Sequence, residues 1–148
     1  MGLQELKKRY INLAEMLPCA FFDLNITGNF IYINKKAKVL LGEEEGILGA
    51  KLAEKVSKKH LYRLLTIFEE AVKKGCDKGE IEIQAGEGEQ RVALEVVAVK
   101  GEEGVTGFQC YVKEGEFKEE PLSREGHEIA LALASARAAL DVADKKKK

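Results

Sequence analysis

The chain has 148 residues, the length of one domain with a short appendage, and 45% of them are hydrophobic, enough for a sizeable core. Charged residues make up 33% of the chain, but their signs nearly cancel, to a net charge of −1. This balance excludes the strong positive field typical of proteins that bind nucleic acid or acidic membrane surfaces.

Membrane and disulfide signals are both weak in this sequence. The apolar runs are too short to span a bilayer, and no signal peptide opens the chain. The three cysteines, Cys19, Cys76 and Cys110, are widely scattered and fit neither a disulfide framework nor a zinc-site spacing. We therefore expect thiols that stay reduced in a cytoplasmic protein, with no contact to membrane or nucleic acid.

An amphipathic helix is predicted for residues 2–16. Its apolar residues recur at steps of three and four, and Pro18 ends the pattern. These residues are Leu3, Leu6, Tyr10, Leu13 and Leu17. The stripe is compatible with a helix packed on its own domain and, because the spacing suits a coiled pair, with a homodimer interface.

A β-hairpin is predicted next, from two short apolar runs at residues 19–25 and 29–34. The intervening Asn25-Ile-Thr-Gly28 offers turn chemistry, since Asn can close an Asx-turn and Gly tolerates a positive φ. The following Asn34 is expected to cap the segment after it. Residues 35–56 are broken by glycines at positions 42, 46 and 49, which favours several short helical turns.

The strongest helix signal covers residues 57–74. Ser57 is a suitable N-cap, and Gly75 is expected to end the helix. The apolar stripe of this helix comprises Leu61, Leu64, Leu65, Phe68, Ala71 and Val72.

Three more strands are predicted at residues 79–85, 90–99 and 105–113, separated by Gly-containing turns. A charged linker and a final helix at 127–143 follow, before a basic tail. We therefore predict an α+β fold, a five-stranded antiparallel sheet with helices on one face. It would divide into a helix at 1–17, a central domain at 18–116, and a linker with a helix at 117–148.

This order of elements resembles that of PAS domains, and several short motifs strengthen the resemblance. PAS sequences typically carry a Pro before the first strand, an Asp-x-x-Gly turn, and an Asn six residues after that Gly. A Leu-Gly pair, a further Gly, a long helix and three strands follow. The matching residues here are Pro18, Asn25 to Gly28, Asn34, Leu41-Gly42 and Gly49. Asn25 replaces the turn Asp of the family but keeps an oxygen that can accept the same hydrogen bonds.

The PAS resemblance implies a pocket between the long helix and the inner face of the sheet. A small-molecule cavity and a core closed by its own side chains are the two alternatives, and the apolar character of the lining favours the closed core. The expected lining is Phe22, Ile31, Ile33, Leu40, Leu52, Val56, Leu61, Leu64, Leu65, Phe68, Leu94, Val96, Phe108 and Cys110.

Two cofactors known from relatives with this fold are not expected. Light-sensing relatives carry Gly-Arg-Asn-Cys-Arg-Phe-Leu-Gln where this chain has Gly49-Ala-Lys-Leu-Ala-Glu-Lys-Val56, without the reactive cysteine. Gln109 alone, on the last strand, does not hold a flavin. Haem-binding relatives ligate iron through a His near the start of the long helix, where His60 lies. The lysines at positions 58 and 59 instead suggest a solvent-facing turn.

His127 raises a third possibility, because His127-Glu128-Ile129 is similar to the phosphoacceptor run of histidine kinases. The residues that usually follow in that family are missing, and the chain carries no ATP-binding domain. No P-loop, Gly-x-Ser-x-Gly or His-Glu-x-x-His motif is present either. We therefore expect no enzymatic activity, and a His in the first turn of a connecting helix.

The prediction is a cytoplasmic PAS module for sensing and protein interaction, which forms a homodimer and works with neighbouring signalling domains. We expect no resident cofactor, and the core pocket is the place where a small ligand would bind. The alternatives are a haem- or metabolite-binding sensor that uses His60, and a kinase fragment that carries His127 in a degenerate acceptor helix.

Overall fold

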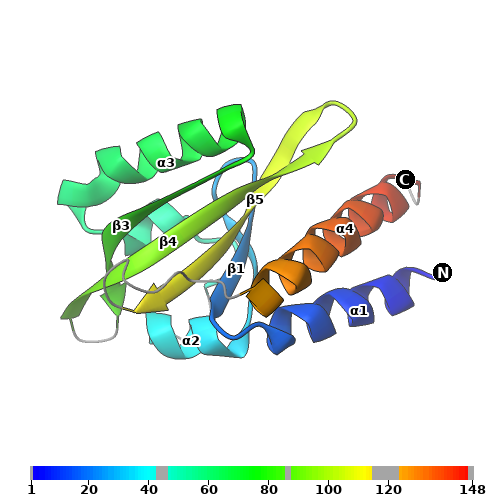
Figure 1. The fold of residues 1–148 in the computed structure, drawn as a ribbon, viewed down its shortest axis with the longest axis horizontal. Helices are drawn as coiled ribbons and strands as arrows, with labels where there is room; N and C mark the ends of the chain where they lie inside the picture. The colour runs from blue at the N-terminus through cyan, green and yellow to red at the C-terminus, as the bar shows by residue number, and fades with distance from the viewer. Residues whose placement is uncertain (1, 43–46, 86–87, 115–123, 147–148) are drawn as a thin grey trace. The chain divides into compact units, whose positions relative to one another are not determined.

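A computed structural model describes residues 2–42, 47–85, 88–114 and 124–146 of the chain (Figure 1). These residues form two compact units, Cys19–Pro121 and the pair of terminal segments Met1–Pro18 and Leu122–Lys148. The helices are α1 (Leu3–Met16), α2 (Lys35–Leu41), α3 (Leu61–Lys74) and α4 (Arg124–Lys146), with 3-10 turns η1 (Leu52–Lys55) and η2 (Lys58–His60). The strands are β1 (Ala20–Asn25), β2 (Phe30–Ile33), β3 (Cys76–Ala85), β4 (Gly88–Gly101) and β5 (Gly104–Glu114).

The five strands form one antiparallel sheet in the order β2-β1-β5-β4-β3, which confirms the predicted five-stranded antiparallel sheet. The first and last strands along the chain pair in the middle of the sheet, with Phe22 opposite Cys110. Strand β3 begins at Cys76, directly after α3, and so starts earlier than the alternating pattern predicted. Strands β2 and β3 are left as the two edges.

The β1–β2 turn has the predicted Asx geometry. Asn25 Oδ1 accepts hydrogen bonds from the backbone N–H groups of Thr27, at 3.1 Å, and Asn29, at 2.9 Å. The same oxygen accepts from the Thr27 hydroxyl at 2.8 Å. Gly28 has a φ of +83°, a conformation that L side chains rarely adopt. The replacement of the usual Asp by Asn therefore leaves this turn intact.

Asn34 caps α2, as predicted, and also ties the helix to the strand beside it. Its Oδ1 accepts from the backbone N–H of Ala37, in the first turn of α2, at 2.9 Å. It also accepts from the N–H of Phe21, at 2.9 Å, and Asn34 Nδ2 donates to the Cys19 carbonyl at 3.1 Å. One buried amide thus joins the start of β1, the end of β2 and the start of α2.

Helix α3 packs on strands β3 and β4 and closes the core on that side (Figure 1). Its buried residues are Leu64, Ile67 and Ala71. A Cβ added to Gly79 of β3 would lie 2.7 Å from Ile67 Cδ1, so the absent side chain allows a close approach of helix to sheet. Gly75 N–H donates to the Ala71 carbonyl at 2.8 Å and ends α3 as predicted.

The start of this helix differs from the prediction. Ser57 precedes the 3-10 turn η2, but its side chain caps neither η2 nor α3, and the buried Oγ has no hydrogen-bond partner in the described residues. Its backbone instead bonds to the edge strand, with Ser57 N–H donating to the Glu82 carbonyl at 3.0 Å. An N-cap role for the Ser57 hydroxyl was therefore wrong, because pairing with β3 fixes this residue's conformation.

A single segment, residues 49–60, bonds to both edge strands of the sheet. On the β2 side, Gly49 N–H donates to the Phe30 carbonyl at 2.8 Å, and Phe30 N–H donates to the Ala50 carbonyl at 2.9 Å. On the β3 side, Val56 forms an antiparallel bridge with Ile83. The segment therefore bonds to both β2 and β3, and its residues Leu52 and Val56 pack in the core against the inner face of the sheet.

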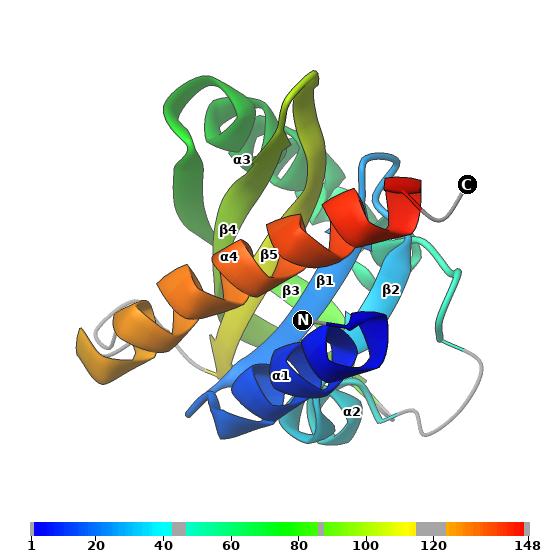
Figure 2. The same cartoon turned by 90° about the vertical axis from the view of Figure 1, so that its right-hand side faces the viewer.

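The terminal unit consists of α1 and α4, which run side by side in antiparallel directions (Figure 2). Buried residues of the two helices are Tyr10, Ala14, Leu133, Ala136 and Arg137. Arg137 Nε lies 3.4 Å from both carboxylate oxygens of Asp141 one turn later. Within the described ranges, no helix has the length and apolar character needed to cross a membrane.

Candidate functional site

The candidate site is a groove in the central unit, between the β1–β2 turn, η1, α3 and β5. Its volume is about 230 Å³. The residues that line it are Ile26, Thr27, Gly28, Lys51, Leu52, Ala53, Leu64, Leu65, Phe68 and Phe108. The groove therefore adjoins the hydrophobic core, and a cation is present among its lining residues.

The floor of the groove is formed by core side chains. Leu52 and Leu64 are 2% and 4% exposed, and both belong to the main hydrophobic cluster. Phe68 and Phe108 meet edge to face, with ring centroids 4.7 Å apart, a favourable aromatic arrangement. Because these groups are apolar, the floor offers contact area and few hydrogen bonds.

The rim of the groove carries two large apolar side chains that remain in contact with solvent. Ile26, in the β1–β2 turn, is 53% exposed, and Leu65, on α3, is 60% exposed. Lys51 completes the rim and is exposed. Its backbone is held by an antiparallel bridge to Asn29 and by a hydrogen bond from the Glu54 N–H at 3.1 Å.

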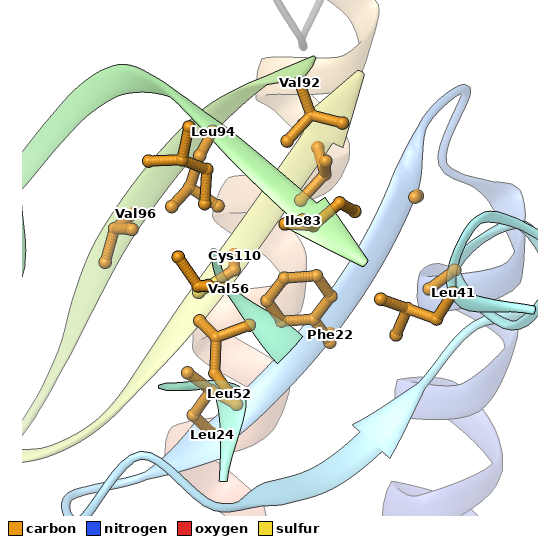
Figure 3. Close-up of a cluster of buried hydrophobic side chains, with 14 of the residues drawn as sticks. Phe22, Leu24, Leu41, Leu52, Val56, Ile83, Val92, Leu94, Val96 and Cys110 are labelled. Carbon is orange, nitrogen blue, oxygen red and sulfur yellow. The ribbon is translucent and has the colours of Figure 1, made fainter. Parts of the chain in front are cut away.

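Most of the predicted pocket lining does lie on the inner face of the sheet and on the elements that cover it (Figure 3). Phe22, Ile33, Leu40, Leu52, Val56, Leu64, Leu94, Val96, Phe108 and Cys110 belong to one buried cluster, with Leu61 and Phe68 packed against it. The cluster also includes residues that the sequence prediction omitted, among them Leu24, Phe30, Ile67, Ile83 and Val92.

Two predicted lining residues lie outside this cluster. Ile31 is 43% exposed, because the β1–β2 pairing shifts register between Asp23 and Leu24 and turns Ile31 away from the core. Leu65 lies on the rim of the groove rather than in the core. Ile31 is therefore a correction to the predicted lining, and Leu65 keeps a place at the site but in contact with solvent.

Two positions, Leu52 and Gln109, were compared with flavin-binding relatives. The first carries an apolar side chain, and the second lies on the outer face of the sheet. Leu52 stands where the reactive cysteine of light-sensing relatives aligns, and it is buried in the core. Gln109 lies on the opposite face of β5 from Cys110, and its Nε2 donates to Asp23 Oδ2 at 3.4 Å. Neither residue offers a polar group to a ligand on the inner face.

His60 is engaged in the fold. Its Nδ1 accepts a hydrogen bond from the backbone N–H of Glu82, on the edge strand β3, at 2.7 Å. In a neutral imidazole this bond requires the proton to sit on Nε2, so neither ring nitrogen has a free lone pair. Ligation of iron by His60 would therefore require the bond to Glu82 to break.

The other candidate groups do not gather into a centre. In the part of the chain that the structure describes, no group of three or more His, Cys, Asp or Glu side chains could hold a metal ion. His127 lies within α4, but its side chain falls outside the described residues. Its proposed role as a phosphoacceptor stays a prediction.

The cysteines differ sharply in their surroundings. Burial raises the pKa of the Cys19 thiol to about 11, and burial raises the pKa of Cys110 well above its usual value. Cys76, at the start of β3, is exposed. The thiols of Cys19, just before β1, and of Cys110, on β5, are thus kept protonated and unreactive at neutral pH.

Comparison with known sequences identifies no relative. No protein-family model matches the chain, and no curated protein matches it. Similarity to known proteins is found instead when the structures are compared.

Solved structures of PAS and LOV domains share the fold. A PAS domain from Colwellia psychrerythraea superposes with a TM-score of 0.67 at 19% identity, covering 77% of this chain and 99% of that one. A PAS domain from a two-component sensor histidine kinase gives 0.62 at 18% identity, over 76% and 99%. A Rhodobacter sphaeroides LOV protein gives 0.66 at 14% identity, over 99% of both chains. The chain thus has a PAS-like fold, with helices added at both ends.

Proposed function

We propose that this protein is a PAS module for sensing and protein interaction in a signal-transduction pathway, and that it is not an enzyme. The observation that carries the proposal is the groove, which adjoins the core of a PAS-like sheet and keeps apolar side chains exposed at its rim. Exposed apolar groups beside a pocket commonly mark a binding site. The similar fold in a sensor histidine kinase supports the same class of function.

We infer that the signal this module senses is the binding of a small ligand in the groove. A ligand seated against Leu52 and Leu64 would contact the same segment, residues 49–60, that bonds to both edge strands. Such a ligand shifts the balance between two packing arrangements by as much as its affinity for them differs. The expected output is a change in how the sheet and its flanking helices pack.

We propose that the chain forms a homodimer through α1. Tyr10 and Leu17 are buried, whereas Leu3, Leu6 and Leu13 each keep part of their surface exposed. Ile11 and Met16, on the same helix, are 43% and 64% exposed. A second copy that covers these side chains would remove apolar surface from water.

Sedimentation of the full chain at several concentrations tests the dimer. A dimer is expected for the wild type, and Leu6→Glu should weaken it because a carboxylate would be placed in an apolar interface. Lys8→Glu is the matched control, since Lys8 is exposed on α1. A strictly monomeric wild type at high concentration would refute this part of the proposal.

We further propose that the protein has no resident haem or flavin and works in the cytoplasm with neighbouring signalling domains. The support is the engaged Nδ1 of His60 and the leucine at position 52. Absorbance of the purified protein tests the absence of a chromophore. A Soret band that disappears in His60→Ala would favour the haem sensor instead, and labelling of His127 by a histidine kinase core would favour the kinase fragment.

A further inference from the structure

We propose that the groove takes a small apolar carboxylate, such as a medium-chain fatty acid, with its hydrocarbon part on the core side and its carboxylate at Lys51. This inference rests on the proposed function, because it names the ligand class for that same groove. It follows from three properties of the lining, which are its polarity, its charge and its size.

The polarity of the lining favours a hydrocarbon body. Leu52, Leu64, Phe68 and Phe108 form the floor, and Ile26 and Leu65 extend the apolar surface to the rim. The nearby Thr27 hydroxyl is already used, since it donates to Asn25 Oδ1 at 2.8 Å and lies 2.7 Å from Asn29 Oδ1. The side chains of the groove therefore offer little hydrogen bonding to a sugar, nucleotide or polyol.

The charge of the rim favours an anion. Lys51 is the one charged residue among the groove's described lining, and within the described residues no carboxylate pairs with its ammonium. The segment from Lys51 to Arg63 also carries three further lysines and a single carboxylate, at Glu54. Of these three lysines, Lys59 is paired with Glu82 at 3.0 Å, and Lys55 is also engaged in an interaction. An apolar ligand with a negative head group would match this arrangement.

The size of the groove limits the ligand. Its volume is about 230 Å³. A water-sized or methylene-sized group takes up roughly 30 Å³, so the groove holds about eight such groups. Octanoate fits this limit, whereas a long-chain fatty acid or a flavin would extend well outside the groove.

The anchoring of Lys51 supports a fixed position for the head group. Its backbone bridges Asn29 and accepts from the Glu54 N–H, and the neighbouring Leu52 N–H donates to the Gly28 carbonyl at 3.0 Å. These bonds hold the start of η1 against the β1–β2 turn. The Lys51 ammonium that would bind the carboxylate is therefore carried by a part of the backbone whose place in the groove is set by the fold.

The test is a titration of the full-length protein with octanoate, octanol and octylamine, all kept monomeric and followed by amide chemical shifts. We expect octanoate to bind more tightly than octanol, and octylamine to bind most weakly. Shifts should cluster on the β1–β2 turn, η1 and α3. Equal affinity for all three ligands would overturn recognition of the carboxylate.

Three variants assign the contacts. Lys51→Gln should lower the affinity for octanoate by about two- to fivefold, the range for a partly exposed ion pair, and leave octanol unchanged. Lys58→Gln is the matched control, since Lys58 is exposed and does not line the groove. Ala53→Phe, which fills the groove from its exposed wall, should abolish binding of both ligands while the far-ultraviolet spectrum stays that of the wild type.

The outcomes separate this inference from the function on which it rests. An equal loss of octanoate affinity in Lys51→Gln and Lys58→Gln would overturn the assignment of the head group to Lys51. Failure of octanoate and octanol to bind a chain that sediments as a dimer would refute the ligand class and leave the interaction module standing. Binding of octanoate to a monomeric chain would uphold the ligand class and refute the dimer.

Discussion

Asn34 and His60 both fasten loops to the sheet through side-chain hydrogen bonds to the backbone, but they do so with unequal strength. Asn34 is 1% exposed and makes three such bonds, to Phe21, Ala37 and Cys19. His60 is half-buried and makes one, with the N–H of Glu82. The groups bonded to Asn34 are shielded from water. When the bond between His60 and Glu82 breaks, by contrast, water can form hydrogen bonds with both groups.

This difference separates a permanent part of the scaffold from a part that can move. The Asn34 side holds β1, β2 and α2 together in the centre of the fold. The His60 side holds the start of α3 to the edge strand, next to the segment that lines the groove. Regions with few buried contacts open first in folded proteins. We therefore expect any response to a ligand to begin on the His60 side.

The largest effect is expected for Asn34→Ala. The substitution leaves two buried N–H groups and one carbonyl unpaired, and each unsatisfied group costs about 1–3 kcal/mol. We expect the free energy of unfolding, measured in urea, to fall by about 3 kcal/mol or more. Asn25→Ala is a matched control, because it also loses three hydrogen bonds but in an exposed turn where water replaces them. Equal losses in the two variants would contradict the role of burial.

The cysteines provide a second contrast, between the buried thiol beside Asn34 and the exposed thiol at the start of the edge strand β3. Because burial raises the pKa of Cys19 to about 11, its thiolate fraction at pH 8 is on the order of a hundredfold below that of an open thiol. Alkylation with iodoacetamide at pH 8, followed by peptide mass spectrometry, should therefore label Cys76 first. Labelling of Cys19 should rise as the pH approaches its raised pKa, and also in Asn34→Ala. Equal rates for Cys19 and Cys76 would show that β1 opens readily.

A smaller effect is expected for His60→Ala. It removes one partly exposed hydrogen bond, which contributes about 0.5–1.5 kcal/mol at a pH where the imidazole is neutral. The local signature should exceed the global one, with faster hydrogen exchange at the Glu82 amide and little change at Phe21. His60→Gln supplies an amide oxygen that can accept the same bond, so partial rescue is expected. Unchanged exchange at Glu82 would refute the contact.

The smallest effect is expected for Lys59→Gln, which removes a partly exposed ion pair on the same edge strand. The hydrogen bond from Lys59 holds the pKa of Glu82 below its usual 4.5. The stability from this pair is therefore present above pH 4.5 and is lost as the pH falls through the lowered pKa. Arg91 Nη2, 3.9 Å from Glu82 Oε1, leaves the carboxylate a second cation.

Urea unfolding of Lys59→Gln and wild type at pH 7 and at acid pH, each with and without added salt, measures this contribution. At pH 7 we expect Lys59→Gln to lose less free energy of unfolding than His60→Ala. Added salt should reduce this loss, and acid should remove it. A loss that persists in acid or in high salt would show that Lys59 contributes through its packing rather than its charge.

The sequence predicted those parts of the fold in which a local pattern decides the structure. Asn25 and Gly28 specify their turn through contacts within five residues, and Asn34 caps the helix that follows it directly. Gly75 ends α3 for the same local reason. The sequence also predicted five antiparallel strands in one sheet. It did not predict their order, because strand pairing connects residues too distant for a local pattern to reveal.

The missed features depend on partners far away in the sequence. The apolar stripe of α3 is wide enough to admit either Leu65 or Ile67 as its centre, and only the close approach to Gly79 selects Ile67. The role of His60 depends on Glu82, 22 residues later. The exposure of Ile31 depends on a register shift between β1 and β2 that no residue type in these strands predicts. The groove combines four such segments, so its lining was only partly predicted.

The use of one segment, residues 49–60, at both edges of the sheet has a consequence for aggregation. Exposed edge strands offer unpaired N–H and C=O groups to other chains. Here parts of β2 and β3 already bond to Gly49, Ala50 and Ser57, within that segment. A change that detached it would uncover both edges together and expose the apolar floor beneath. Such an opening would therefore promote aggregation, because other chains could pair with both edge strands of the same molecule.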